Sequence, residues 1–249
     1  MMTYSPEMIA LVLGGFLLGG ISKGLIGMGL PVVVLAIIAG PLGVASSLSL
    51  LVVPAILTNI WQALDGGALR EILRRLWPFY IAASLGVVVG GLILAGSSEE
   101  LMLAILGLVL TVYSILTLIS PPIPAPGRHE TWMAPSAALL GGVMFGMVGN
   151  FIVPGILYLQ ALGLKRDVLV QALGVNFIVI SSTLALSLTS HNLIAWDSFL
   201  LSCFCVPAAF AGMFIGRHVR RYVSESGFRK TFLFALLATG IYTFFRAVL

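Results

Sequence analysis

The sequence predicts an all-α polytopic membrane protein made of two inverted repeats of about five apolar segments each, which gives 8–10 membrane helices. Three observations predict this fold: an apolar composition, a series of apolar runs, and a glycine pattern that recurs in the second half of the chain. Of 249 residues, 59% are hydrophobic and 9% are charged, and the mean hydropathy is +1.12. Because globular chains carry roughly a quarter charged residues, a soluble domain is excluded.

The apolar runs define the expected elements in order. The first half holds runs near 8–22, 25–40, 44–64, 76–96 and 101–119, and the second half holds runs near 132–148, 151–163, 168–189, 196–216 and 230–248. Most are long enough to cross a hydrocarbon core of about 30 Å as a helix. The runs 25–40 and 151–163 are marginal for that length, so we expect broken or re-entrant helices at the start of each repeat.

The first run begins with a helix-start pattern, Ser5-Pro6-Glu7. Serine is a favoured cap, proline suits the first turn, and an acidic residue suits the positive end of the helix. The preceding residues contain no lysine or arginine, so they lack the basic start of a cleavable signal peptide. We therefore expect this run to remain in the mature protein.

A proline-rich segment, SPPIPAPGRHE (120–130), separates the two halves. We expect an N-terminal repeat over 1–120, a linker over 121–131 and a C-terminal repeat over 132–249. The glycines that match between the halves, in the same order, are Gly20, Gly24 and Gly27 with Gly142, Gly146 and Gly149, followed by Gly86 and Gly90 with Gly212 and Gly216. Such an ordered series favours duplication over chance.

Lysine and arginine concentrate in the segments 65–75, 164–167 and 217–230, and are absent from 41–43, 96–100 and 189–197. Because basic loops tend to stay in the cytoplasm, the linker is predicted to be cytoplasmic and both termini external. This assignment makes the halves inverted repeats, which is typical of secondary transporters. The expected location is the cell (inner or plasma) membrane, as a multi-pass protein.

The start of each repeat contains a helix-breaking segment, GGISKGLIGMGLP (19–31) and GGVMFGMVGNFIVP (141–154). Glycine weakens a helix, and proline favours a new helix start. A break at membrane depth leaves backbone N–H groups at the positive end of a half-helix, where an anion is stabilised. We therefore expect the two breaks to form one central anion site. Close helix packing is the alternative explanation for Gly20 and Gly24.

Lys23 lies inside this apolar stretch, and burying a lysine at the bilayer centre costs about 2.5–3.5 kcal/mol. Contact with an anionic ligand would offset that cost. The alternatives are snorkelling to the cytoplasmic surface and a purely structural contact. The second-half counterpart of Lys23 is Phe145, so its role is not shared by both repeats.

Every Asp and Glu lies at or near a predicted helix boundary, and His129, His191 and His218 lie in loops or at helix ends. We therefore expect no metal site, no cofactor and no catalytic residues. The nearby cysteines, Cys203 and Cys205, match neither a redox pair nor a zinc motif. An intramembrane Ser22–Lys23 nucleophile pair is disfavoured, because neighbouring helical residues do not face each other. Nucleic-acid binding is disfavoured because the basic residues lie in short loops.

The polar groups available for a ligand are amides and hydroxyls, and helix–helix hydrogen bonding is the alternative role for each amide. Asn150 stands apart, since it could both cap the half-helix that begins near 151 and face the ligand. Gln62 is a further amide of this kind. The predicted substrate-binding residues are Ser22, Lys23, Gly24, Gly27, Gly29, Asn59, Gly146, Gly149, Asn150, Gln171 and Asn176.

These features together resemble the sulfite exporter TauE/SafE family of transmembrane permeases. The two glycine-rich segments with a following proline and the segment ASSLSLLVVPAILTN (45–59) support the resemblance, which covers nearly the whole chain. The family implies transport of small anions such as sulfite, organosulfonates or sulfoacetate. The sequence departs from it where a denser glycine run is usual, at Leu30 and at 151–153, and 168–176 contains neither Ser nor Thr.

The leading functional hypothesis is a membrane transporter that moves a small anion (sulfite, an organosulfonate, sulfoacetate or a related organic acid) by alternating access around a midplane site. An anion channel and, less favoured, a membrane scaffold subunit are the rival hypotheses. The expected partners are the anionic substrate and the lipid bilayer, with a homodimer left open.

Overall fold

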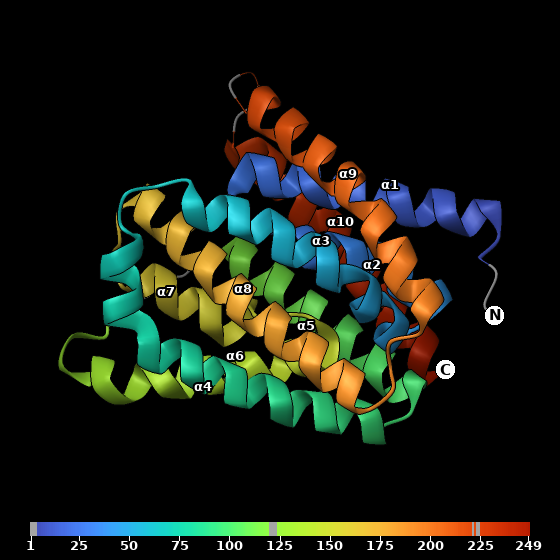
Figure 1. Ribbon diagram of the computed structural model, residues 1–249, viewed down its shortest axis with the longest axis horizontal. Coiled ribbons are helices and arrows are strands. Elements are labelled where there is room, and N and C mark those ends of the chain that lie inside the picture. The colour runs from blue at the N-terminus through green and yellow to red at the C-terminus, as the bar shows by residue number, and fades with distance from the viewer. Residues whose placement is uncertain (1–3, 120–123, 221, 223–224) are drawn as a thin grey trace. The chain divides into compact units, whose positions relative to one another are not determined.

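The computed structural model describes residues 4–119, 124–220, 222 and 225–249 (Figure 1). Helices and their connecting turns make up this part of the chain, and it contains no strand. Residues 121–123 of the predicted linker lie outside the described residues. Helix α6 begins at Glu130, within the range predicted for the linker.

The helices follow the apolar runs closely. They are α1 (Pro6–Ile26), α2 (Leu30–Leu42), α3 (Val44–Leu64), α4 (Leu69–Gly96), α5 (Glu99–Ile119), the short turn η1 (Gly127–His129), α6 (Glu130–Val148), η2 (Ile152–Ile156), α7 (Leu157–Ala161), α8 (Arg166–Ser190), α9 (Trp196–Val219) and α10 (Glu225–Val248). Eight helices of the described chain are long and apolar enough to cross a membrane, while Leu30–Leu42 and Ile152–Ala161 are shorter. The all-α polytopic prediction is confirmed.

The start of α1 has the expected geometry. Pro6 occupies the first turn, and the Ser5 hydroxyl accepts a hydrogen bond from the Met8 amide at 3.2 Å. This bond satisfies one of the amide groups that a helix start leaves without an intrahelical partner.

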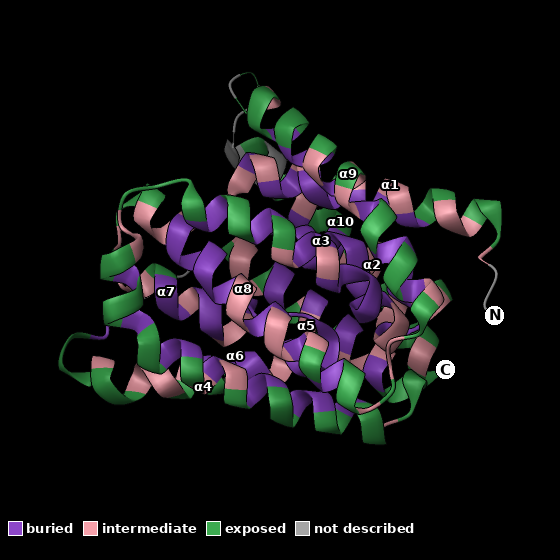
Figure 2. Cartoon of the chain, viewed as in Figure 1, coloured by how far each residue is buried: buried purple, intermediate pink, exposed green. Residues whose placement is uncertain are grey.

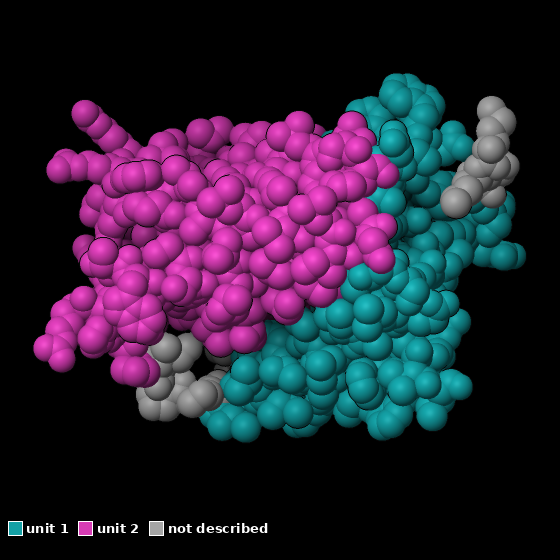
Figure 3. Space-filling model, turned by 90° about the horizontal axis from the view of Figure 1, so that it is seen from below, with its two compact units in different colours: residues 1–54, 97–121, 192–249 teal, residues 55–96, 122–191 magenta. Residues whose placement is uncertain are grey.

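The chain forms two compact units (Figure 3). Unit 1 contains residues 1–54, 97–121 and 192–249, and unit 2 contains residues 55–96 and 122–191. Each unit therefore combines segments from both halves of the sequence. The assignment of the two halves as repeats remains a prediction.

In unit 1, α1 packs against α9 along a seam of glycines (Figure 1). A Cβ atom placed on any of these glycines would overlap a backbone carbonyl oxygen of the facing helix, so only glycine allows this close approach. The glycines, with the residue that each faces, are Gly20 (Ala209), Gly24 (Met213), Gly212 (Leu17) and Gly216 (Ile21).

In unit 2, α4 packs against α6 along an equivalent seam. Its glycines, with the residue that each faces, are Gly86 (Leu139), Gly90 (Val143), Gly142 (Ala83) and Gly146 (Val87). The first long helix of each half thus packs on the third long helix of the other half. Close packing, the alternative that the sequence left open, accounts for the glycines of both seams.

Buried residues lie where helices meet, and the outward faces of several long helices are exposed (Figure 2). These exposed faces are apolar: Leu92 is 55% exposed, Phe204 is 72% exposed and Phe234 is 59% exposed. Apolar surface of this kind is a liability in water, but it suits contact with lipid tails.

Candidate functional site

The first break separates α1 from α2 in unit 1. Helix α1 ends when Gly27 adopts a left-handed conformation (φ 81°), with its amide bonded to the Lys23 carbonyl at 2.8 Å. Gly29, with φ 106°, precedes α2, and Pro31 lies in the first turn of that helix. These φ values strain any residue with a Cβ, so the two glycines set the position of the break.

The second break separates α6 from η2 in unit 2 and repeats this geometry. Gly149 adopts φ 68°, and its amide bonds to the Phe145 carbonyl at 2.8 Å. Lys23 and Phe145 therefore hold matching positions, as the glycine spacing predicted. Both expected breaks are confirmed.

Asn150 holds the start of the segment after the second break. Its Oδ1 accepts a hydrogen bond from the Ile152 amide at 2.9 Å. Asn150 thus bonds to the first residue of η2 from the position before the N-cap residue, Phe151. The side chain is 1% exposed, and its Nδ2 has no hydrogen-bond partner among the described residues. The two N–H groups of Nδ2 are thus buried beside a helix start without an acceptor among the described residues.

Ser22 provides a similar group at the first break. It is 1% exposed, and its Oγ lies 2.7 Å from the point that a Cβ on Gly29 would occupy. Within the described chain this hydroxyl has no hydrogen-bond partner. Each break therefore has a buried polar donor next to the start of its second helix.

Asn176, on α8, is fully buried, and neither atom of its amide has a partner in the described part of the chain. The next residue, Phe177, contacts Phe145 and Phe151, with ring centroids 6.0 Å and 6.4 Å apart. Helix α8 therefore runs beside the second break. These contacts are made by Phe177 and not by Asn176, so they place α8, and not the Asn176 amide, beside the break.

The two predicted glutamines have a structural role. Gln62 Nε2 donates to the Val170 carbonyl at 2.7 Å, and Gln171 Nε2 donates to the Ala63 carbonyl at 2.7 Å. Gln171 Oε1 also accepts from the Ala68 amide at 3.0 Å. These bonds join α3 to α8 and to the turn before α4. Helix–helix hydrogen bonding, the alternative for these amides, thus accounts for both.

Asn59 bonds within its own helix, where Nδ2 donates to the Ala55 carbonyl at 2.7 Å. Lys23 lies one turn before the first break, is only 5% exposed and interacts with other groups of the protein. Such burial argues against a lysine that snorkels to the aqueous surface. Gly24 and Gly146 lie in the helix seams, where packing explains them.

Some buried polar groups were not indicated by the sequence. The hydroxyls of Tyr158, Ser181 and Ser187 are buried and have no partner among the described residues. Ser and Tyr are common in apolar helices, and no glycine or proline pattern marks these positions. Only the three-dimensional structure identifies them.

In the described chain, no three His, Cys, Asp or Glu residues come together as a metal site would require. Cys203 is exposed, Cys205 is buried, and both are free thiols. Each break therefore combines a helix end with uncharged polar groups, and Lys23 lies one turn before the break in unit 1.

A polytopic helical fold with discontinuous helices and buried polar groups is typical of membrane transporters. The model of the family "Sulfite exporter TauE/SafE" matches residues 11–243, nearly the whole chain, and the protein belongs to this family. The family consists of membrane transporters of sulfite and other anions, so the resemblance noted in the sequence is confirmed. No curated protein and no solved structure matches the chain.

Proposed function

We propose that the protein carries a small anion across the membrane by alternating access, and that the anion binds beside the broken helices. The proposed substrate class is sulfite, an organosulfonate, sulfoacetate or a related organic acid. Membership of the sulfite exporter family supports this class.

The observation that carries the proposal is the unpartnered donor beside each half-helix start, Ser22 Oγ at one break and Asn150 Nδ2 at the other. A buried donor without a partner costs about 1–3 kcal/mol. An oxyanion presents only acceptors, so at either break it would satisfy the donor there and lie at the positive end of the helix that follows, α2 or η2. Asn176 would provide a further uncharged donor.

Lys23 supports the same choice of ligand charge. An ammonium at membrane depth costs about 2.5–3.5 kcal/mol on insertion scales, and a nearby anion lowers that cost. The glycines of the two breaks, Gly27, Gly29 and Gly149, would let the ligand approach the backbone closely.

A thermal-shift screen of the purified protein tests binding. Sulfite, sulfate, thiosulfate, sulfoacetate, taurine and simple carboxylates are compared, because a ligand at about 100 times its Kd stabilises the folded state by about 2.7 kcal/mol. The variant Asn150→Ser keeps an oxygen to cap the Ile152 amide but removes Nδ2. We expect one anion class to stabilise the parent protein selectively and to lose most of that effect in Asn150→Ser.

Gln160→Ser, at an exposed position of α7, is the matched control and should retain the full shift. Lys23→Ala tests which group attracts the anion. If the variant loses the thermal shift, the lysine ammonium attracts the anion. If the shift is unchanged, the positive ends of the half-helices do. If no anion stabilises the parent protein, the anion proposal is wrong.

Exchange in liposomes tests the transport mechanism. An alternating-access carrier should exchange labelled anion saturably, with no single-channel current. A single-channel current would instead support the anion channel, and absence of both would favour a scaffold subunit.

A further inference from the structure

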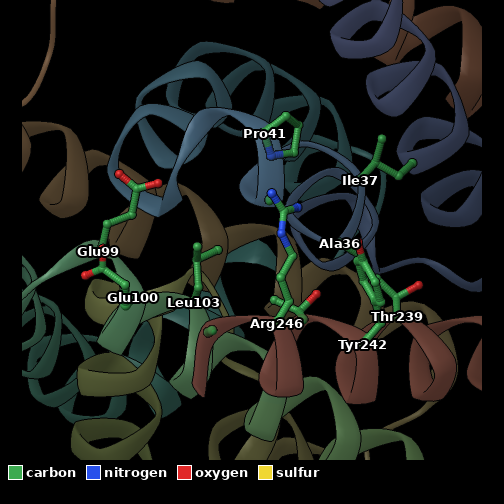
Figure 4. A pocket seen from close by; sticks show the side chains of 12 residues that line it. Ala36, Ile37, Pro41, Glu99, Glu100, Leu103, Thr239, Tyr242 and Arg246 are labelled. Carbon is green, nitrogen blue, oxygen red and sulfur yellow. The ribbon is translucent and has the colours of Figure 1, made fainter. Parts of the chain in front are cut away.

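A crevice of about 360 Å³ lies in unit 1, where three helix ends meet (Figure 4). The C-terminal end of α2, the first turn of α5 and the last turns of α10 form its walls. Its polar lining comes chiefly from Glu99, Glu100, Tyr242 and Arg246. None of these residues belongs to the breaks described above.

The crevice gathers charges of both signs. In Figure 4 the Arg246 side chain points toward Pro41, with Glu99 and Glu100 on another side of the hollow. All three charged side chains are exposed, and in the described part of the chain Arg246 forms no ion pair with either glutamate. The opposite charges thus stand in one hollow without neutralising each other directly.

The backbone of α2 makes room for these groups. A Cβ on Gly40 would lie 3.5 Å from Arg246 Nη1, and a Cβ on Gly43 would lie 2.9 Å from the Glu99 carboxyl carbon. Each charge also suits its own helix end, since acidic residues favour the first turn and basic residues the last turn. Because the start of α5 and the end of α10 line the same hollow, this preference brings both signs together there.

We expect the crevice to lie at the level of lipid headgroups. It is formed by the ends of α5 and α10, which both contain membrane-spanning segments, Glu99–Ile119 and Lys230–Val248. Two aromatic residues of α10 project nearby: Tyr242 is 64% exposed and Phe245 is 54% exposed. Tyrosine and tryptophan are enriched at the membrane–water interface, and Tyr242 fits this preference.

We propose that this crevice binds a phospholipid whose headgroup carries both a phosphate and a primary ammonium, as phosphatidylethanolamine does. Arg246 would hold the phosphate through its planar fork of N–H donors. Glu99 and Glu100 would accept hydrogen bonds from the ammonium. A quaternary ammonium has no N–H to donate, and a glycerol headgroup has no cation for the carboxylates.

Lipid titration of the detergent-purified, delipidated full chain tests this proposal. Short-chain phosphatidylethanolamine, phosphatidylcholine and phosphatidylglycerol are added, and the rise of the unfolding midpoint gives an apparent Kd for each. Phosphatidylethanolamine should bind most tightly. Equal binding of the three lipids would overturn the proposal.

Three variants assign the contacts. Arg246→Gln should weaken phosphatidylethanolamine and phosphatidylcholine alike, by about two- to five-fold for one partly exposed ion pair. Arg246→Lys keeps the positive charge and should retain most of the binding, which guards against a folding defect in the first variant. Glu99→Gln with Glu100→Gln should reduce phosphatidylethanolamine to the level of phosphatidylcholine and leave phosphatidylcholine unchanged.

Arg70→Gln, an exposed arginine at the start of α4 in unit 2, is the matched control and should change nothing. If it weakens binding as much as Arg246→Gln does, the effect is general surface charge and the proposed site is wrong. Soluble glycerophosphoethanolamine is the final comparison. If it stabilises the protein as well as the lipid does at equal concentration, the ligand comes from solution rather than from the membrane, which also overturns the proposal.

Discussion

At the residue scale, Ser202 repairs a defect that a proline creates in another helix. Pro54 lies inside α3 and has no amide hydrogen, so it cannot bond to the carbonyl four residues earlier, that of Leu50. The Ser202 hydroxyl on α9 donates to this carbonyl at 2.7 Å instead, and Ser202 is fully buried. One side chain therefore completes the hydrogen bonding of a neighbouring helix.

We expect Ser202→Ala to lower the free energy of unfolding by about 1–3 kcal/mol, because the Leu50 carbonyl would remain buried without a partner. The unfolding midpoint in detergent measures the change. The control is Ser136→Ala on α6, where the exposed hydroxyl bonds to the Trp132 carbonyl of its own helix and its loss should matter little. Equal effects of the two variants would contradict this role.

Individual roles were predictable from the sequence where the residue type itself dictates a conformation. Gly27 and Gly149 mark left-handed helix ends, and Asn150 marks a helix start, because few other residues suit those positions. The roles of Gln62 and Gln171 were not predictable in this way. An amide can bond to a ligand or to another helix, and only the packing of α3 on α8 decides between them.

At the scale of elements, glycine seams determine how closely helices approach. Gly20 faces the backbone of α9, where an added Cβ would come within 3.0 Å of the Met213 amide nitrogen. Gly14, on the same helix, has nothing within 4 Å of its added Cβ. The two positions thus provide a matched test of the seam.

We expect Gly20→Ala to destabilise the protein by about 1–3 kcal/mol, the usual cost of overpacking a tight contact. Gly14→Ala should be neutral or stabilising by up to about 1 kcal/mol, because alanine favours helix. Unfolding midpoints of the two variants, measured side by side, check both expectations. A harmless Gly20→Ala would mean that the seam does not require close approach.

The extent of each element was largely predictable, because apolar runs bounded by Gly, Pro and charge coincide with the helices. The start of α4 was not: it begins at Leu69, ahead of the apolar run near 76–96, in a basic stretch. Helix partners were not predictable either. A Gly-x-x-x-Gly pattern marks a face that permits close approach, but it carries no information about which helix meets that face.

At the scale of the whole molecule, the compact units do not coincide with the halves of the sequence. Helices α1 and α9 belong to unit 1, and α4 and α6 belong to unit 2. A duplicated sequence reveals that two copies exist but not whether each copy packs on itself. The crossed pairing of first and third long helices was therefore beyond sequence analysis.

The predicted orientation can be tested with single cysteines in a background where Cys203 and Cys205 are replaced by serine. Ser97→Cys and His191→Cys should react with a membrane-impermeant thiol reagent from outside, because their loops lack basic residues. Arg128→Cys and Tyr222→Cys should react only after the membrane is permeabilised. If Arg128→Cys and Tyr222→Cys are labelled from outside, the predicted topology is wrong.

The crossed pairing also constrains how the protein is made. As the chain leaves the ribosome, α1 enters the membrane long before α9 is synthesised, so its glycine seam has no intended partner until most of the protein exists. A chain ending after the first half would carry both α1 and α4 without their partners, and quality-control proteases should remove it. Pulse-chase labelling of residues 1–120 alone, against co-expression with residues 121–249, would reveal whether the second half rescues the first.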